Sequence, residues 1–436
     1  MKLKKKIQIF IPIFLSLILL LPGQTSSFAA TKENNNFSVE AKAALAFDFE
    51  TGKILYEKNS EEKLEIASLT KLISLYVVQT KIASGELAWD TPVTISKAIS
   101  ELSLSPKLSN IPLMEGQNYS VKELFDAATI VSANAATVAL AEKIAGNEFA
   151  FVDLMKEQLI AWGIENPLIV NASGLNNEDI PGEIYPGSAR TDENKLTAKE
   201  LALVSRNLIR DFPETLQVTS QAVLNYTNVE GEESIMYTTN LLLPGMPYAK
   251  AGVDGLKTGT TDLAGRSLIT TMKKDNQRVI TILLNATDQE DPDARYTETS
   301  RLLDLLDYSF GSWESKAVVT KGQMIPTVEP IPVEKSLEGS VDLIAQDTIE
   351  LFLPIKEDLN TVDFKLDYLD NQALLIAPVE ANQAVAKLTV TYPQDTLGYL
   401  EPVEALTTIL VTKSSVEKAN FFQLTWQKIQ QFFSKR

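Results

Sequence analysis

The chain contains no histidine and no cysteine among its 436 residues. These two absences exclude a Ser-His-Asp triad, a cysteine nucleophile, zinc sites built on His or Cys, iron–sulfur clusters and disulfide bonds. Any general base must therefore be a Lys, Tyr, Asp or Glu side chain. The 44% hydrophobic and 22% charged residues are typical of globular proteins, and the length allows two or three domains.

Positive charge is also scarce, because 40 Lys and Arg stand against 57 Asp and Glu, which gives a net charge of −17. The two ends differ from the rest. Residues 1–29 carry four Lys and no acid, residues 413–436 carry a net +4, and the residues between them therefore carry −25. A nucleic acid needs a basic face that neutralises its phosphates. We therefore expect no nucleic-acid partner.

The N-terminal segment has the pattern of a secretory signal peptide. Lysines precede an apolar run from Ile7 to Pro22, and small residues follow at Ala29 and Ala30. A basic start, a short apolar region and a small-residue cleavage site are typical of such signals. The alternative is a transmembrane anchor, but the run is shorter than the roughly 20 residues that a span needs. We expect residues 1–29 to be removed from an exported protein.

The C-terminal segment, residues 413–436, predicts an amphipathic helix. Within 418–436, Phe422, Trp426, Ile429 and Phe433 recur at spacings of four, three and four, with glutamines and lysines on the other side. Such a helix is suited to lie in a membrane interface. A terminal helix packed on its own protein is the alternative. The net +4 of this segment favours an anchor that holds an acidic body at the outer face of the cytoplasmic membrane.

Between the ends, the chain divides into a mixed part and an all-β part. Residues 37–315 predict strands at both ends and helices between them, including hairpins at 43–58 and 267–286 and a helix at 299–308. This order suggests an antiparallel sheet assembled from both ends of one domain. Pro326, Pro330 and Pro332 predict a linker. Alternating patterns at 362–368 and 386–392 then predict a small all-β domain over 316–412.

With histidine and cysteine absent, a serine activated by lysine is the natural nucleophile. Ser-x-x-Lys occurs three times, and two copies, Ser60 to Lys63 and Ser415 to Lys418, lie in charged stretches where solvation is expected to keep the lysine protonated. Ser68 instead opens an apolar helix, so Ser68 and Lys71 share one face of its first turn. Burial and the helix N-terminus lower a lysine pKa, and a neutral Lys71 can accept the serine proton. A capping serine beside a solvent-directed lysine is the alternative.

Two further motifs follow in order along the chain. Ser-x-Asn occurs at Ser132 to Asn134, on a predicted turn between two buried helices, and at Ser205 to Asn207, inside a predicted helix. Lys-Thr-Gly occurs once, as Lys257-Thr258-Gly259 followed by Thr260, where the glycine is expected to let a ligand approach a strand closely. The three motifs together form a set found in penicillin-binding proteins and class A β-lactamases.

The chain resembles the low-molecular-mass penicillin-binding proteins that are D-alanyl-D-alanine carboxypeptidases. The resemblance runs from about Phe37 to Trp313 and also includes Asn171-Ala-Ser-Gly-Leu175, Thr239-Asn-Leu-Leu242 and Ala264-Gly265. It implies an α/β (α+β) catalytic domain of the serine β-lactamase/transpeptidase type at 37–315. A β-rich domain at 316–412 then holds this domain off the membrane, and the C-terminal helix is the anchor.

The resemblance also implies roles for single residues. Ser68 attacks the D-Ala-D-Ala bond of a peptidoglycan stem peptide with Lys71 as base, Ser132 relays the proton, Asn134 orients the substrate amide and Lys71, and Lys257 supplies positive charge. The N–H groups of Ser68 and Thr260 form the oxyanion hole. Substrate binding falls to Thr258, Gly259, Thr260 and Arg295, with a solvated salt bridge as the alternative role of Arg295. No metal or organic cofactor is implied, and β-lactams are expected as covalent inhibitors.

Two other functions are possible on sequence grounds. A class A β-lactamase needs Glu-x-x-Leu-Asn after the second motif, and Glu165-Asn-Pro-Leu168 is followed by Ile169 instead. A non-catalytic wall-binding scaffold would not need the complete motif set. We therefore expect a carboxypeptidase that limits cross-linking of the cell wall and is inhibited slowly by β-lactams.

Overall fold

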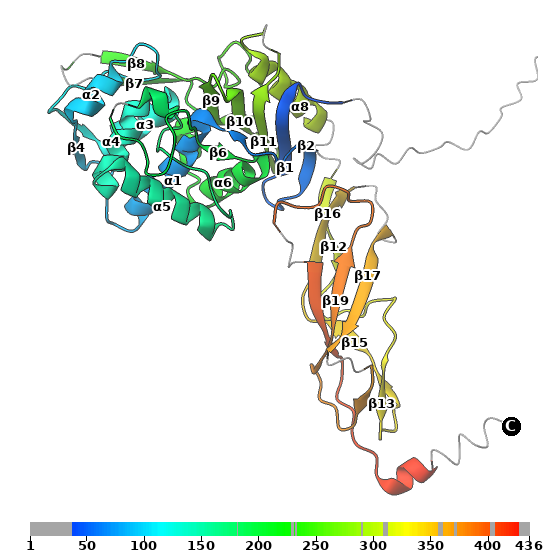
Figure 1. The fold of residues 1–436 in the computed structure, drawn as a ribbon. Helices are drawn as coiled ribbons and strands as arrows, with labels where there is room; N and C mark the ends of the chain where they lie inside the picture. Colours follow the sequence, from blue (N-terminus) through cyan, green and yellow to red (C-terminus); the bar gives the residue numbers. More distant parts are fainter. Residues whose placement is uncertain are drawn as a thin grey trace, which may run out of the picture.

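The computed structural model describes residues 37–180, 182–227, 231, 233–288, 291–307, 313–355, 361–369, 373–401 and 406–426. The predicted signal peptide at 1–29 and the end of the predicted anchor, 427–436, lie outside these residues. Within them, the chain forms a mixed α/β body from which an elongated arm of strands projects (Figure 1).

A five-stranded antiparallel sheet, with the order β2-β1-β11-β10-β9, forms the frame of the body. The first strand of the described residues, β1, pairs with the last strand of the body, β11, as the sequence predicted. Both predicted hairpins are confirmed. The strands are β1 (Ala41–Asp48), β2 (Ile54–Lys58), β9 (Val253–Thr261), β10 (Gly265–Lys274) and β11 (Gln277–Ala286).

Both faces of this sheet are covered, because successive residues of its strands are apolar and point to opposite sides. Leu45 and Ile282 belong to the cluster under α1 (Lys71–Ala83), α5 (Glu148–Ala161) and α6 (Ala198–Asp211). Their neighbours Ala44 and Leu283 pack with α8 (Ala294–Asp307) on the other face. This helix was predicted at 299–308, and in the structure it begins earlier, at Ala294.

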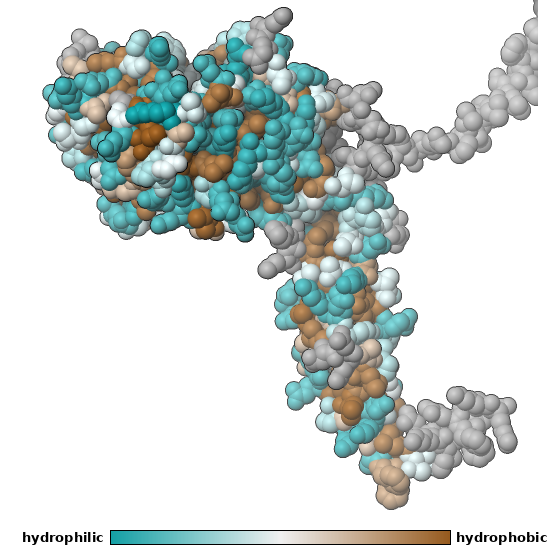
Figure 2. All heavy atoms as spheres, in the orientation of Figure 1, coloured by the Kyte–Doolittle hydropathy of each residue, from teal (hydrophilic) through white to brown (hydrophobic). Residues whose placement is uncertain are grey.

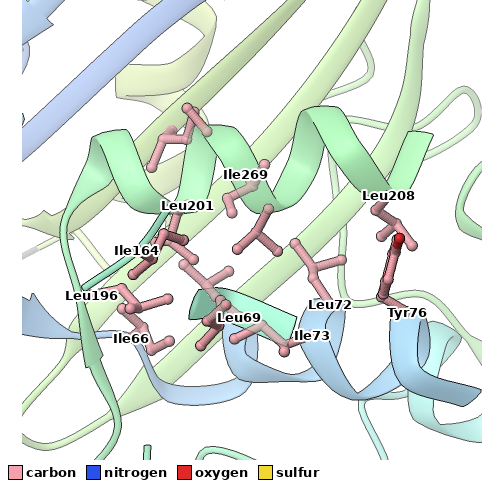
Figure 3. Packing of buried hydrophobic residues seen from close by; sticks show 14 of the residues in the cluster. Ile66, Leu69, Leu72, Ile73, Tyr76, Ile164, Leu196, Leu201, Leu208 and Ile269 are labelled. Atoms are coloured by element: carbon pink, nitrogen blue, oxygen red, sulfur yellow. The ribbon is translucent and has the colours of Figure 1, made fainter. Parts of the chain in front are cut away.

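A helical lobe adjoins the sheet and has its own core. It contains α2 (Lys97–Ser103), α3 (Val121–Ile130) and α4 (Asn134–Ala145), with α3 opened by a capping box between Ser120 and Glu123. Helix α1 lies between the two cores. Its residues Leu72 and Ile73 pack toward the sheet (Figure 3). Leu75 and Val78 pack toward the lobe, so the helix is buried on both sides. Lys71, in the first turn of this helix, is therefore also buried.

Smaller elements complete the body. They are the 3-10 helices η1 (Ala67–Thr70) and η2 (Asn177–Asp179), the helix α7 (Thr215–Thr219), and the paired strands β3 (Leu64–Glu65) with β6 (Lys195–Leu196), β4 (Pro92–Thr94) with β5 (Asn118–Ser120), and β7 (Val223–Thr227) with β8 (Glu233–Tyr237).

The arm has a third hydrophobic core and consists of short sheets. The alternating patterns correspond to β17 (Asp363–Tyr368) and β19 (Ala384–Thr391), which pair with each other. The expectation of a linker at Pro332 was wrong, because this residue lies in β13 (Ile331–Glu334). The other strands are β12 (Trp313–Val319), β14 (Ser340–Val341), β15 (Leu343–Ala345), β16 (Ile349–Pro354), β18 (Leu375–Ile376) and β20 (Thr407–Thr412).

The arm contacts the body through the segment that follows β19. The Lys53 ammonium, buried beside β2, donates to Asp395 at 2.8 Å and to the Gly398 carbonyl at 3.0 Å. Arg206 of α6 pairs with Glu401 at 2.8 Å. At the far end of the arm, residues 421–426 are helical, and Phe422 and Trp426 are exposed there (Figures 1 and 2). Within the described residues, no helix is both long and apolar enough to cross a membrane.

Candidate active site

The three sequence motifs come from three elements of the body. Ser68 lies in η1, directly before α1, Ser132 lies on the turn between α3 and α4, and Lys257 lies in β9. Lys71 in the first turn of α1 is fully buried, whereas Ser68 is partly exposed. The positions match the expected ones, except that Ser68 is in a 3-10 turn rather than in the α-helix itself.

Two residues of the site with a Cβ have a strained backbone. Ala67 has φ of 45° and Ser132 has φ of 63°, the left-handed region that residues with a Cβ rarely adopt. Such strain costs about 1–3 kcal/mol per residue and persists only where surrounding contacts impose it. For Ala67, one such contact comes from the loop 171–175, whose Gly174 lies directly against the Ala67 carbonyl.

Lys71 makes three short hydrogen bonds at the centre of the site. Its Nζ lies 2.9 Å from the Ser68 Oγ, 2.7 Å from the Asn134 Oδ1 and 2.7 Å from the Ser173 carbonyl oxygen. Burial lowers the pKa of Lys71 well below its ordinary value, and the charge of Lys257 lowers it further. The site therefore favours the neutral amine.

The geometry suits that neutral amine. A neutral Nζ has two N–H donors and one lone pair. The Asn134 amide oxygen and the Ser173 carbonyl are acceptors only, so they take the two N–H groups. The lone pair then faces the Ser68 hydroxyl, which is the one partner able to donate a proton. The Nδ2 of Asn134 donates to the Ser109 carbonyl at 3.1 Å, which fixes the orientation of this amide.

Lys257 differs from what the sequence predicted. It is fully buried, its Nζ donates to the Thr258 carbonyl at 3.0 Å, and burial together with the charge of Arg295 lowers its pKa to about 7. We expected this lysine to remain charged. A bound anion would favour the charged form of this lysine.

Arg295 is buried in the first turn of α8, beside β9 and β10. Its guanidinium donates to the carbonyl oxygens of Gly259 at 3.0 Å and Ser267 at 3.4 Å. Its Nε has no hydrogen-bond partner within the described residues, and none of the ion pairs found there includes it. The alternative of a solvated salt bridge was wrong, and the site holds a buried cation without a carboxylate.

The β9 residues have different surroundings. Thr258 is buried and its Oγ1 lies 2.7 Å from that of Thr239, whereas Thr260 is exposed. The expected open approach at Gly259 was wrong. A Cβ there would meet the Ile66 carbonyl at 2.9 Å and the Leu69 side chain at 3.1 Å, so this glycine allows close packing of β9 against η1.

The other copies of the short motifs lie elsewhere. Ser205 is inside α6, as predicted, and Ser415 and Lys418 are exposed. Ser60 was expected to be solvated and is instead buried, with its hydroxyl donating to Glu57 at 2.9 Å. None of these residues contributes a contact to Lys71.

Sequence reasoning missed the side chains that hold the loop 171–175. Buried Asn194 accepts from the N–H groups of Val170 and Asn171 and donates to Thr70, which ties the loop to η1. Glu148, at the start of α5, accepts from the Ala172 N–H at 2.9 Å. These residues lie far from the motifs in sequence, and no spacing rule indicates them.

The fold and the site define a class of enzyme that transfers acyl groups through a serine activated by lysine. The sequence profile of the D-alanyl-D-alanine carboxypeptidases matches residues 28–288, which is more than half of the chain. The chain belongs to this family.

Individual relatives agree with that assignment. The chain is 28% identical over 407 residues to the D-alanyl-D-alanine carboxypeptidase DacF of Bacillus subtilis, covering 93% of each protein. It is 26% identical over 414 residues to DacC of Escherichia coli, covering 94% of this chain and 92% of DacC. A solved structure of a peptidoglycan synthesis regulatory factor (PBP3) from Streptococcus pneumoniae matches with a TM-score of 0.65 and 39% identity, covering 87% of this chain and all of that one.

Proposed function

We propose that the protein is a serine D-Ala-D-Ala carboxypeptidase that removes the terminal D-Ala from peptidoglycan stem peptides and so limits cross-linking of the cell wall. The observation that carries the proposal is the buried Lys71 amine 2.9 Å from the Ser68 hydroxyl. Its pKa is lowered and its other two bonds go to acceptors, so it is a ready general base.

The reaction runs in two steps. Ser68 Oγ bonds to the carbonyl carbon of the penultimate D-Ala as Lys71 takes its proton. Ser132 passes a proton to the leaving amine when the C–N bond breaks, and water then hydrolyses the ester. Asn134 positions Lys71 and the substrate amide, and the N–H groups of Ser68 and Thr260 bind the oxyanion.

The substrate carboxylate is bound by the basic side of the site. Lys257 and Arg295 are both buried and have lowered pKa values because of burial, so a carboxylate that enters relieves their mutual repulsion. Thr258 and Thr260 supply hydroxyl donors. Gly259 contributes by letting β9 approach η1, which brings Thr260 toward Ser68.

β-Lactams acylate the same serine in this proposal and are released slowly. The structure of penicillin-binding protein D2 from Listeria monocytogenes in the ampicillin-bound form, 31% identical with a TM-score of 0.50, supports antibiotic binding by the fold. The carboxylate weighed for a β-lactamase, Glu165, is exposed in the segment after α5, whereas the carboxylate that accepts from the loop 171–175 is Glu148. This favours the peptidase.

The test is release of D-Ala from a stem pentapeptide by the mature protein, with labelling by a fluorescent penicillin alongside. The wild-type protein should show both, and Ser68→Ala should show neither. A stable penicillin adduct on Ser68→Ala would refute the nucleophile assignment. Absence of both activities from the folded wild-type protein would favour a wall-binding scaffold.

For location, we propose an exported protein anchored peripherally at the outer face of the membrane through residues 418–436. The exposed side chains of Phe421, Phe422 and Trp426 at the tip of the arm support this proposal. The arm, which begins with β12 at Trp313, then separates the active site from the bilayer.

A further inference from the structure

Strand β10 carries an arginine that has no part in the reaction proposed above. Strand β9, which holds the third motif, is the edge of the sheet, and β10 lies beside it (Figure 1). The register of the two strands places Arg266 of β10 directly opposite Thr260 of β9. Directly opposed residues stand on the same face of a sheet, with Cβ atoms about 4.5–5.5 Å apart. Arg266 is therefore a neighbour of the residue whose N–H group binds the oxyanion in the proposed reaction.

Thr258 shares this face of the sheet, because it lies two residues before Thr260 on the same strand. The two threonines are the hydroxyl donors assigned to the substrate carboxylate, so the terminal residue of the peptide lies beside them. Thr260 is exposed and Arg266 is half-buried, so both can meet a ligand that enters from solvent. Arg266 therefore borders the place of the leaving residue.

Arg266 has no ion-pair partner among the residues that the structure describes. Its charge reaches Arg295, because burial lowers the pKa of the Arg295 guanidinium and the charge of Arg266 adds to the effect. Arg295 donates to the carbonyl of Gly259, the residue directly before Thr260. Two guanidinium groups that lack an ion pair in the described chain thus lie at one end of the site.

The charges at this end exceed what a D-Ala terminus can balance. A peptide that ends in D-Ala brings one negative charge here, its terminal carboxylate, which the buried Lys257 and Arg295 bind in the proposed function. The side chain of D-Ala is a methyl group, so Arg266 gains no counterion when such a peptide is bound. An excess of positive charge favours a ligand with a second anionic group.

We propose that Arg266 is a specificity-determining residue that favours a leaving residue with a second carboxylate, a D-amino acid with an acidic side chain. The proposal rests on the carboxypeptidase function and adds a specificity to it. The terminal carboxylate is held by Lys257, Arg295 and the two threonines, and the side-chain carboxylate pairs with Arg266. The peptide bond before the leaving residue is hydrolysed through the same two steps.

The experiment uses diacetyl-L-Lys-D-Ala-X peptides, in which X is D-Glu, D-Gln or D-Ala, and the mature wild-type protein. D-Glu and D-Gln are similar in size and differ in charge, so the ratio of their kcat/KM values isolates the effect of the side-chain carboxylate. We expect a ratio of about five in favour of D-Glu, as for a partly exposed ion pair. The ratio should fall as salt is added, because salt screens exposed charges.

Three variants test the assignment to Arg266. In Arg266→Gln the ratio of D-Glu to D-Gln should fall to about one, whereas Arg266→Lys keeps the charge and should keep a ratio above one. Lys273→Gln is the matched control, because Lys273 is an exposed cation further along β10, and it should keep the fivefold ratio. Labelling by a fluorescent penicillin shows that each variant retains its active site.

The outcomes separate the specificity from the carboxypeptidase function. Equal kcat/KM for D-Glu and D-Gln, or release of D-Ala alone, would overturn the role of Arg266 and leave the carboxypeptidase intact. A ratio that survives in Arg266→Gln, with kcat/KM for all three peptides reduced by one common factor, would also overturn it and assign Arg266 to the terminal carboxylate. Absence of any released residue and of penicillin labelling in the wild-type protein would overturn the carboxypeptidase function, and the specificity with it.

Discussion

Gly174 provides a direct test of whether the loop 171–175 holds the nucleophile in place. Its φ is +81°, and a Cβ added there would lie 1.9 Å from the Ala67 carbonyl oxygen and 2.4 Å from its carbon. An ordinary contact begins at 3.4 Å, so the backbone of residue 67 or of the loop must move by about 1.5 Å in Gly174→Ala. Ser68 is the next residue along the chain and must move with it.

The magnitude follows from two separate costs. A left-handed alanine costs about 1 kcal/mol, and the collision adds about 1–3 kcal/mol of overpacking, so the free energy of unfolding should fall by about 2–4 kcal/mol. A displacement of about 1 Å at a reacting group reduces the rate by about a hundredfold. Acylation of Ser68 by penicillin should therefore slow by about this factor while the protein remains folded.

Gly163 supplies the matched control. Its φ is +80°, and no atom lies within 4 Å of an added Cβ. Gly163→Ala should therefore lose only about 1 kcal/mol and acylate normally. The assays are thermal melting and the rate of labelling by a fluorescent penicillin. Normal acylation of Gly174→Ala, or equal losses in the two variants, would refute the role assigned to the loop.

Three further predictions concern protonation, the arm and the tail. Lys71 is a base only when neutral, so the acylation rate should fall as pH drops through the lowered pKa of Lys71. Lys257→Met removes a neighbouring positive charge, which should raise the pKa of Lys71 and move this loss of acylation to higher pH. An unchanged pH dependence would contradict the effect of Lys257 on Lys71. Asp395→Asn leaves the buried Lys53 without its charge partner and should lower the free energy of unfolding by about 3 kcal/mol. D-Ala release from a soluble peptide should be unchanged, and an unaltered melting temperature would argue against this contact. Truncation after Thr412 should make the mature protein soluble with full peptidase activity, and its retention in the membrane fraction would count against the anchor.

The sequence predicted the parts of the site that depend on local patterns. The apolar run after Ser68 indicated a buried helix, and α1 is buried on both sides for that reason. The hairpins were also predictable, because turn residues act over a few positions. These local signals were enough to place Ser68, Lys71 and Asn134 on elements that meet.

The remainder depends on contacts between distant segments, which spacing does not reveal. Ser173 acts through its backbone carbonyl, a group that every residue has, so no residue type identifies it. The neighbour of Gly259 is η1, some 190 positions earlier, rather than a ligand. The pKa of Lys257 falls to about 7 only because the fold buries it near Arg295.

Because the chain has no histidine, its site relies on buried lysines, and their burial lowers the free energy of unfolding of the protein. Lys71, Lys257 and Arg295 are buried in a chain with a net charge of −17, yet no described carboxylate forms an ion pair with them. Lys257 has a pKa of about 7 in the folded protein and 10.5 as an ordinary lysine, so at neutral pH it costs on the order of 4 kcal/mol of folding free energy. This cost is fully present below pH 7 and disappears as pH rises toward 10.5, because the unfolded chain binds more protons in that window. An ion pair would remove the cost, but it would also occupy the cations that a substrate carboxylate needs. The unpaired cations lower stability and keep the site available for an anionic ligand.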